Sequence, residues 1–591
     1  MHPILNTYVN NLTEEFQFSG LDGPKLFEAF CNYCVLSKTY LGRFNPLDVT
    51  TEEDDASIDG LAVCIDGELI LTEGDAEAAF DTHKRNLEVD LIVTQVKSGD
   101  KFDKSEISSF ALGLQDFLSL TPKLPNGEYN QEVLNIFKVV IGNLKKVSNN
   151  RPNCAVYYCT SGNYAAEREV DATLRILKST VEDSDLFHEV VVHPFGRKEL
   201  ISTWKSINEK NEAKVKLEEY CGIPKNKDIP QSYIGIVNGR VFVESLLLDS
   251  EKNLKHSVFE ENVRSFLGDD NTVNSNIANT LQSDDKRHLF SVLNNGITVV
   301  APQLTLTANS KEMDLVNYQV INGCQTSNTL FQQLAHLDDS VNIVVRFIES
   351  PNYEISADII SATNSQTGIG QERFQGLKEK AKLVQHYFDM ENSKHTGVRH
   401  NQIYFERREN EYREHSYYAT QIFDVRELGR AFAAGILNDA HNASRYPKNL
   451  FKTVGEQFFK DTDSEALYYM CALTLYKFNM LSNGSKENAN LYTKYKWHII
   501  QLFMWVVHGK IADIQANSSK AQKYADKVVK ALNSSDKKYT DAFVECFEII
   551  DSVTPAPTSD QIKRSKFTAD LREQAKKHFE AKKNKQAAEV V

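Results

Sequence analysis

The stretch that most constrains this chain is residues 89–98, which reads Val-Asp-Leu-Ile-Val-Thr-Gln-Val-Lys-Ser. Its apolar, β-branched residues predict a buried strand that ends in an amide and an ammonium group. Alternate side chains of a strand share a face, so we expect Gln95 and Lys97 to point the same way. An earlier predicted strand, residues 58–66, begins beside an acid, Asp59. These three polar groups predict one site at the end of a sheet.

The three residue types suit a phosphodiesterase that depends on a metal ion. A hard divalent cation takes oxygen ligands and keeps several waters. A positive charge near the attacking water stabilises hydroxide and the charge that develops on the phosphate. Asp59 would supply the carboxylate, and the Gln95 side-chain oxygen or the Val96 carbonyl would complete the shell. Lys97 would stand near the nucleophile, and the cofactor we expect is Mg²⁺ or Mn²⁺.

An acid at a strand start followed by (E/Q)-x-K at the end of a buried strand resembles the PD-(D/E)XK nuclease superfamily, with Gln95 in place of the usual acid. The resemblance implies a restriction-endonuclease-like αβββαβ core. It also implies that Glu28, on the helix before the site, is an outer metal ligand or shapes the site. Because a glutamine replaces the acid, we expect weak metal affinity unless a neighbour such as Glu73 or Asp75 assists. The predicted elements follow that order: helix 25–37, strands 58–66, 67–72 and 88–97, helix 104–119 and strand 154–160.

The plainer interpretation of the same residues is structural. An isolated D…QxK pattern occurs by chance in many chains, and an amide and a lysine at a strand end usually face solvent.

Composition limits the classes of protein that this chain can belong to. It has 591 residues, 41% of them hydrophobic and 25% charged, with a net charge of −14. These values are typical of soluble multidomain proteins and give no overall basic field, so a nucleic-acid groove would be a local patch. No apolar run approaches the roughly 20 residues that cross a bilayer. The nine scattered cysteines indicate reduced thiols. We expect a cytoplasmic protein without a membrane partner.

Breaks in periodicity divide the chain into three predicted domains. The predicted nuclease-like domain is 1–225, a central α+β domain is 226–455, and a helical region with a basic tail is 456–591. The fold class is therefore α/β and α+β multidomain. The central domain is expected to open with a hairpin, in which strands 233–237 and 240–247 flank an Asn-Gly type I′ turn. The lysine-rich tail is either a solvated helix or a contact to nucleic acid.

Three segments of the central domain are rich in amide side chains: 293–299, 319–328 and 361–367. Amides carry donors and acceptors, so such a set suits recognition of a nucleotide, a nucleic-acid backbone or a partner's main chain. The alternative is that the Asn-Gly pairs make turns and the amides cap helices. In that case Asn322-Gly323 followed by Thr326 would be a strand-to-helix cap.

The succession of these segments resembles the AIPR family, named for abortive-infection phage resistance. The matching pieces are residues 259–268, 294–298, 321–328, 362–366 and 404–408, so the resemblance covers roughly 230–455. It implies antiphage defence, often with a nuclease-like region in front. Two adjacent arginines in the last piece either contact phosphate through their guanidinium groups or pair with nearby acids on the surface. The candidate binding residues are Asn262, Arg264, Asn294, Asn295, Asn322, Gln325, Thr326, Asn364, Gln366, Arg407 and Arg408.

Our leading hypothesis is a bacterial antiphage nuclease that cleaves DNA rather than RNA. We expect a homo-oligomer, such as a dimer, that is held inactive at rest by oligomerisation or by the second domain until an unknown phage trigger acts. The rival hypothesis is a non-catalytic sensor of nucleic acid or of a phage component, in which the first domain is a degenerate nuclease fold. A third hypothesis is that the Asn-Gly-x-Gln-Thr segment binds or hydrolyses a nucleotide by itself.

Overall fold

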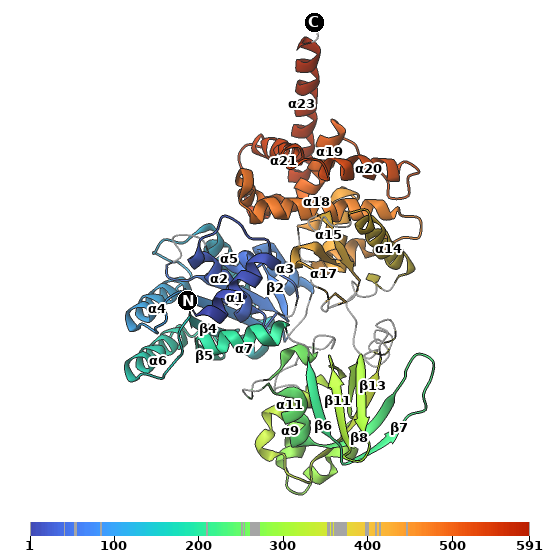
Figure 1. Ribbon diagram of the computed structural model, residues 1–591. Coiled ribbons are helices and arrows are strands. Elements are labelled where there is room, and N and C mark those ends of the chain that lie inside the picture. The colour runs from blue at the N-terminus through green and yellow to red at the C-terminus, as the bar shows by residue number, and fades with distance from the viewer. Residues whose placement is uncertain are drawn as a thin grey trace.

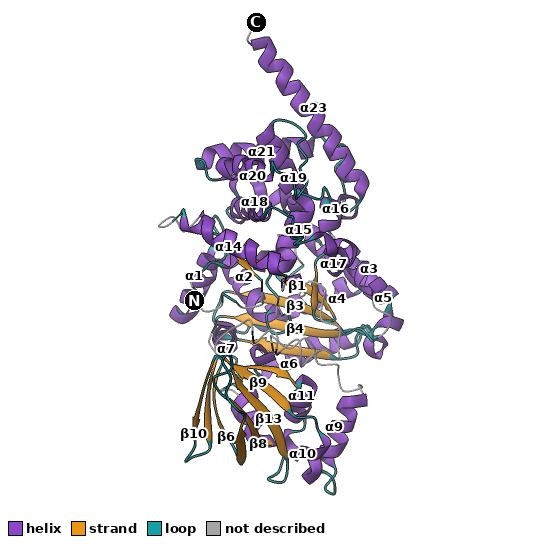
Figure 2. Ribbon diagram, turned by 90° about the vertical axis from the view of Figure 1, so that its right-hand side faces the viewer, coloured by secondary structure: helices purple, strands orange, loops and turns teal. Residues whose placement is uncertain are grey.

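The structure is a computed structural model of a mixed α/β multidomain protein (Figure 1). We name three parts: the N-terminal domain (2–208), the middle region (211–349) and the helical body (375–589). Figure 2 shows strands in the first two parts and almost only helices in the third. The described residues are 2–40, 42–51, 56–82, 86–208, 211–249, 252, 254–259, 272–350, 355, 359, 375–376, 378–395, 401–407, 411–412, 415, 417–444 and 447–589.

A five-stranded mixed sheet forms the centre of the N-terminal domain, in the order β2-β1-β3-β4-β5. β1 pairs antiparallel with β2 and β3, whereas β3-β4 and β4-β5 are parallel. The four strands expected in this domain are present, within a few residues of their expected ends: β1 Gly60–Ile65, β2 Glu68–Ile70, β3 Val89–Lys97 and β4 Asn153–Thr160. The fifth strand is β5 Val190–Phe195.

Helices cover both faces of this sheet. One face carries α1 Pro3–Glu15, α2 Gly23–Leu36 and α7 Arg197–Asn208, and the other carries α3 Glu73–Thr82, α4 Lys104–Leu118, α5 Glu128–Gly142 and α6 Arg168–Glu182. On β3, Leu91 and Val93 face the α4 side, whereas Ile92 and Val96 face the α2 side. Strand alternation therefore places Gln95 and Lys97 on the α4 side.

Short polar caps fix where the helices beside this sheet begin. The Asp22 carboxylate accepts from the Lys25 N–H at 2.9 Å and starts α2. The Asp103 carboxylate accepts from the N–H groups of Ser105 and Glu106 and starts α4, a few residues after β3 ends. Such caps satisfy N–H groups that have no partner within the helix. They place the first turn of α4 directly after the end of β3 in the chain.

Two sheets build the middle region, in the orders β10-β11-β6 and β12-β9-β13-β8-β7. The strands at 212–222 already pair here, so these sheets begin before the predicted junction at residue 225. The strands are β6 Glu212–Lys216, β7 Glu219–Gly222, β8 Ser232–Asn238, β9 Ile297–Ala301, β10 Gln303–Thr307, β11 Glu312–Val316, β12 Gln319–Asn322 and β13 Asn342–Glu349. The helices are α8 Gly239–Phe242, α9 Thr272–Gln282, α10 Phe290–Leu293 and α11 Cys324–Gln332.

The prediction of a hairpin at Asn238-Gly239 is wrong, because β8 is followed by a helix and not by a second strand. The Asn238 Oδ1 accepts hydrogen bonds from the backbone N–H groups of Arg240, at 3.0 Å, and Val241, at 3.3 Å. Asn238 therefore caps α8. A π-helical turn, Val243–Leu247, continues from α8. Phe242 and Leu246 lie four residues apart and are both fully buried. Burial of this helical face outweighs the local preference of Asn-Gly for a turn.

One hydrophobic core runs through the helical body, from Ala381 to Phe579, so the body begins before the predicted boundary at residue 455. Large aromatic residues of the helical body, including Trp497, Phe503 and Trp505, are buried in that core. The elements are α14 Glu379–Ser393, β14 Tyr404–Glu406, β15 Ile422–Asp424, α15 Val425–Gly435, α16 Ala440–Ala443, α17 Pro447–Val454, α18 Glu465–Asn483, α19 Lys496–His508, α20 Ala521–Leu532, α21 Asp536–Asp551, α22 Ser559–Ile562 and α23 Ser565–Glu589.

Polar contacts join the N-terminal domain to the helical body. The Arg426 guanidinium donates to both carboxylate oxygens of Glu68, at 2.8 and 3.1 Å, and Arg43 pairs with Glu406 at 2.9 Å. Between the two parts lies a cavity of about 1680 Å³. Charged side chains of both signs line it, so the contact between the two parts is not a continuous apolar core.

Buried carboxyls around this cavity predict a pH-dependent stability. Burial raises the pKa of Glu427 to about 7. An unfolded glutamate titrates near 4.3, so between about 4.5 and 7 the folded chain holds a proton that the unfolded chain has released. The unfolding free energy contributed by Glu427 therefore falls as pH rises through that window. We expect the melting temperature of Glu427→Gln, relative to wild type, to increase between pH 5 and pH 8. A difference in melting temperature that is constant or decreases over this range would contradict the prediction.

Candidate active site

Asp59 is held against the end of β3. Its backbone N–H donates to the Thr94 carbonyl at 2.9 Å, which continues the β1-β3 ladder by one residue. Its carboxylate Oδ2 accepts two hydrogen bonds, from the Val96 N–H at 2.6 Å and from the Gln95 Nε2 at 2.5 Å. The side chain is buried, with 7% of its surface exposed. The structure therefore brings Asp59 and Gln95 into direct contact at the end of the sheet.

The Gln95 side chain is fully buried, and its two ends differ. Nε2 donates to Asp59, whereas Oε1 has no hydrogen-bond partner among the residues that the structure describes. A buried amide oxygen without a donor costs about 1–3 kcal/mol. Such an exception in a folded protein calls for an explanation. An amide oxygen is also a ligand that hard cations accept, so Gln95 presents one unused ligand beside a carboxylate.

Lys97 lies at the outer edge of the same face. Its Nζ forms an ion pair with the Glu106 Oε2 at 3.2 Å, and the two side chains are 37% and 48% exposed. Glu106 stands in the first turn of α4, where the Asp103 cap positions it. Our sequence reasoning missed Glu106. The available signal was an acid in the first turn of a helix that follows the predicted strand.

Glu28 does not lie on this face. It belongs to α2, which packs against the other side of the sheet, and it pairs with Lys25 at 2.8 Å. Asp75 is also remote, because it follows β2, which pairs with the end of β1 opposite Asp59. Asp75 lies 3.7 Å from Lys563 of the helical body. The predicted roles of Glu28 and Asp75 as metal ligands therefore receive no support from the geometry.

A second residue that sequence reasoning missed is Asn32 on α2. Its Nδ2 donates to the Asp59 carbonyl at 2.9 Å and to the Thr50 hydroxyl at 3.0 Å, and its Oδ1 accepts from the Thr94 hydroxyl. Gly60 makes room for it, since a Cβ at that position would lie 2.3 Å from the Asn32 Oδ1. The signal was an asparagine on the apolar side of a predicted helix and a glycine inside an apolar strand.

The close approach of Gly60 and Asn32 predicts that one methyl group added at residue 60 lowers the stability of the protein. Gly60→Ala would force Asn32 and Thr94 apart, and overpacking of this kind costs about 1–3 kcal/mol. We expect a lower free energy of unfolding in urea for Gly60→Ala, and no comparable change for Gly99→Ala, where a Cβ meets nothing within 4 Å. Equal urea midpoints of unfolding for Gly60→Ala and wild type would show that the site tolerates displacement of Asn32.

The donors at this site fit a weakly held, oxygen-bound cation. The Asp59 carboxylate and the Gln95 amide group are in contact through the Gln95 nitrogen, and carboxylate and amide oxygens are both hard ligands of the kind that Mg²⁺ and Mn²⁺ accept. Among the described residues, no three or more His, Cys, Asp or Glu side chains are grouped to hold a metal ion.

The amide residues of the middle region gather where β9 begins and β12 ends. These two strands pair antiparallel, with Asn322 opposite Thr298. The Asn294 Nδ2 donates to the Thr326 hydroxyl at 3.2 Å, across two segments of the chain. Gly323 has a φ of +93° and joins β12 to α11. Asn295 is exposed beside this cluster, whereas Gln325 is buried in the first turn of α11. The segment that joins β12 to α11 is therefore both a strand-to-helix connection and part of a polar cluster.

Residues 259–542 match the family model described as AIPR protein. No curated protein and no solved structure matches the chain significantly. The AIPR match extends from the middle region to α21 and supports the resemblance that the amide segments predict. It begins well after Asp59 and Gln95, so it leaves the N-terminal site unassigned.

Within the AIPR-matched region, Arg407 is directed into the protein. Its side chain is 7% exposed, and its Nε donates to the Gln385 Oε1 at 2.8 Å while Nη1 donates to the Gly376 carbonyl at 3.2 Å. These bonds favour a structural role over the phosphate contact predicted as one alternative. The remaining predicted binding residues lie outside the described residues; they are Asn262, Arg264, Asn364, Gln366 and Arg408.

None of the helices in the described ranges combines the length and the apolar character needed to cross a bilayer.

Proposed function

We propose that this protein is a metal-dependent nuclease of antiphage defence, with Asp59, Gln95 and Lys97 as its active site. The AIPR match suggests abortive-infection defence. The observation that carries the nuclease proposal is the contact between the Asp59 carboxylate and the Gln95 amide, at 2.5 Å. The strand order and the helices on both faces support a restriction-endonuclease-like core around that contact.

In this proposal Asp59 and Gln95 bind the cation, and Lys97 contacts the phosphate. Asp59 and Gln95 would hold Mg²⁺ or Mn²⁺, which when bound acidifies a water and neutralises charge on the phosphate. The buried position of Asp59 keeps its carboxylate oriented by two N–H donors. Lys97 is the exposed member of the site, so its ammonium would leave Glu106 and donate to the phosphate oxygen that gains charge. The proposed substrate is DNA rather than RNA, and the proposed assembly is a homodimer.

A substrate panel tests this function. Plasmid, linear duplex DNA, single-stranded DNA and RNA are incubated with the protein and Mg²⁺, Mn²⁺ or EDTA. We expect cleavage that EDTA abolishes and that Lys97→Ala slows by about 10²-fold, the scale of one lost electrostatic group at a transition state.

The matched control for this panel is Lys101→Ala, because Lys101 is an exposed lysine four residues further along the chain. It should cleave at the wild-type rate. Cleavage that survives EDTA, or that falls equally in both lysine variants, would refute the assigned role of Lys97.

A second candidate function is a non-catalytic sensor, and one observation favours it. The Asp59 Oδ2 already accepts two N–H donors, as a structural carboxylate does. In that case the protein would still protect cells from phage after loss of the Asp59 carboxylate. Plaque counts with Asp59→Asn separate the two functions, because the nuclease requires that carboxylate for protection.

A further inference from the structure

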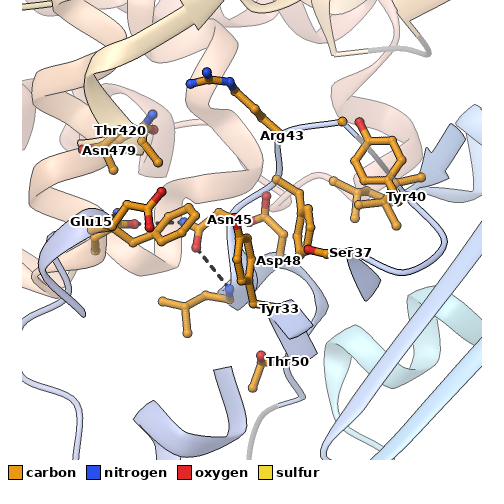
Figure 3. Close-up of a pocket in the computed structure, with 18 of the residues that line it drawn as sticks. Glu15, Tyr33, Ser37, Tyr40, Arg43, Asn45, Asp48, Thr50, Thr420 and Asn479 are labelled. Carbon is orange, nitrogen blue, oxygen red and sulfur yellow. Dashed lines mark hydrogen bonds between the residues drawn. The ribbon is translucent and has the colours of Figure 1, made fainter. Parts of the chain in front are cut away.

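Residues 43–51, which we call the strap, lie between the helical body and Asp59. The strap forms part of one wall of the cavity of about 1680 Å³. Figure 3 shows Arg43, Asn45, Asp48 and Thr50 of the strap in the same close-up as Thr420 and Asn479 of the helical body. The contacts at its two ends connect different parts of the molecule.

The first half of the strap is bonded to the helical body. Arg43 pairs with Glu406 at 2.9 Å, and Glu406 is only 2% exposed. The Asn45 Nδ2 donates to the Asn483 Oδ1 at 3.1 Å, and Asn483 in turn donates to the Phe16 carbonyl at 2.9 Å. Arg43 is 34% exposed, but its removal would leave the buried Glu406 carboxyl without its guanidinium partner, so Arg43 is expected to contribute to this contact.

The middle of the strap also faces the body. Burial raises the pKa of the Asp48 carboxyl, and the positive charges of Lys496 and Arg430 oppose that rise. Both cations belong to the helical body, on α19 and α15. Asp48 therefore lies in the electric field of the body as well as in the wall of the cavity.

The second half of the strap is bonded to Asp59. The Thr51 N–H donates to the Asp59 carbonyl at 3.2 Å, and the Thr51 hydroxyl donates to the Ile58 carbonyl at 2.6 Å. The Asn32 amide donates to both the Thr50 hydroxyl and the Asp59 carbonyl. One short segment thus links the body to the residue that carries the proposed chemistry.

The surroundings of the strap allow this link to change. The N-terminal domain and the helical body meet through ion pairs and amide bonds around a large cavity, whereas protein interiors are normally close-packed. Interfaces of this polar kind between domains permit relative motion. A shift of the body would pull on Arg43 and Asn45, and the same segment would displace Thr50 and Thr51 from Asp59.

We propose that the strap couples the docking of the helical body to the position of Asp59, so that the AIPR-matched part of the chain regulates the N-terminal site. The regulatory part rests on the proposed nuclease function, whereas the mechanical link rests on the bonds of the strap alone. The bonds of the strap form a continuous connection between the two sites, and coupling between distant sites is carried by hydrogen-bond and salt-bridge networks of this kind.

Hydrogen-deuterium exchange of the full chain tests the link without any assay of activity. Asn483→Ala removes the body's bonds to Asn45 and Phe16 from a position outside the strap. We expect exchange to rise about tenfold, the scale of one lost hydrogen bond, at the end of α18 and also in residues 56–62, which include the Asp59 N–H. Arg43→Ala should give the same pattern from the other contact.

The matched control is Lys494→Ala. Lys494 joins the body to Glu128 of the N-terminal domain at 2.9 Å, but the two side chains are 37% and 73% exposed and lie off the strap. Such an exposed pair contributes little, so exchange at 56–62 should stay at the wild-type level. Exchange that rises in the body but not at 56–62 in Asn483→Ala and Arg43→Ala would overturn the proposed coupling.

Cleavage and Mn²⁺ affinity measured on the same samples decide the regulatory part. A change in both that follows the exchange at 56–62 supports regulation through the strap. Unchanged cleavage and affinity despite faster exchange refute regulation. If wild type neither cleaves nor binds Mn²⁺, the nuclease function fails, and faster exchange at 56–62 still supports the mechanical link.

Discussion

Asp59→Asn is expected to lose at least about 10²-fold in the rate of DNA cleavage, the scale of one preorganised electrostatic group, while keeping the fold. The Val96 N–H and the Gln95 amide both donate to a single oxygen, Oδ2. An asparagine carbonyl can accept the same two bonds, so the backbone arrangement should persist. The charge that would hold the cation is lost. Initial rates of plasmid nicking in Mn²⁺, with a thermal melt of each protein, measure both effects.

The matched control for Asp59→Asn is Asp100→Asn, because Asp100 is an exposed acid shortly after β3. It should nick plasmid at the wild-type rate. If Asp59→Asn melts and nicks like wild type, Asp59 is not a catalytic residue, and any nuclease activity arises elsewhere in the chain.

Gln95→Glu is expected to strengthen cation binding by about tenfold, since affinity for hard divalent cations rises with the number of charged oxygen ligands. The substituted side chain would place a second carboxylate beside Asp59, where the Gln95 Nε2 now stands 2.5 Å from the Asp59 Oδ2. Like charges at this distance repel when no cation is present. The metal-free variant should therefore melt below wild type and gain more melting temperature from added Mn²⁺.

The control for this prediction is Gln115→Glu, which adds the same charge at an exposed position on α4. Its melting temperature should respond to Mn²⁺ as wild type does. A Gln95→Glu variant with wild-type stability and no gain from Mn²⁺ would mean that Gln95 does not face a cation.

The strands of the N-terminal domain were predictable because their signals are local. The apolar run at 89–97 is buried on both faces, and its alternation alone placed Gln95 and Lys97 on one side. Helices α3 and α5 were not predicted. The hairpin at Asn238-Gly239 failed because burial of Phe242 and its neighbours, a tertiary effect, decides between a turn and a helix cap.

The candidate site was predictable in part, for the same reason. Asp59 and Gln95 meet because adjacent strands place them on one face, which periodicity reveals. Asn32 and Glu106 come from helices whose packing sequence periodicity does not specify. Glu28 was assigned by resemblance, and the packing of α2 places it on the other face. Arg407 looked like a surface arginine because Gln385 and Gly376, which bind it, are distant in the sequence.

The central claim is that Asp59 and Gln95 hold a divalent cation, and a Mn²⁺ titration followed by electron paramagnetic resonance tests it most directly. The spectrum of free Mn²⁺ is recorded as wild type, Asp59→Asn and Asp100→Asn are added. The account predicts that wild type and Asp100→Asn remove about one Mn²⁺ per chain, whereas Asp59→Asn removes far less. Equal removal of Mn²⁺ by all three proteins, or removal by none, would contradict the account.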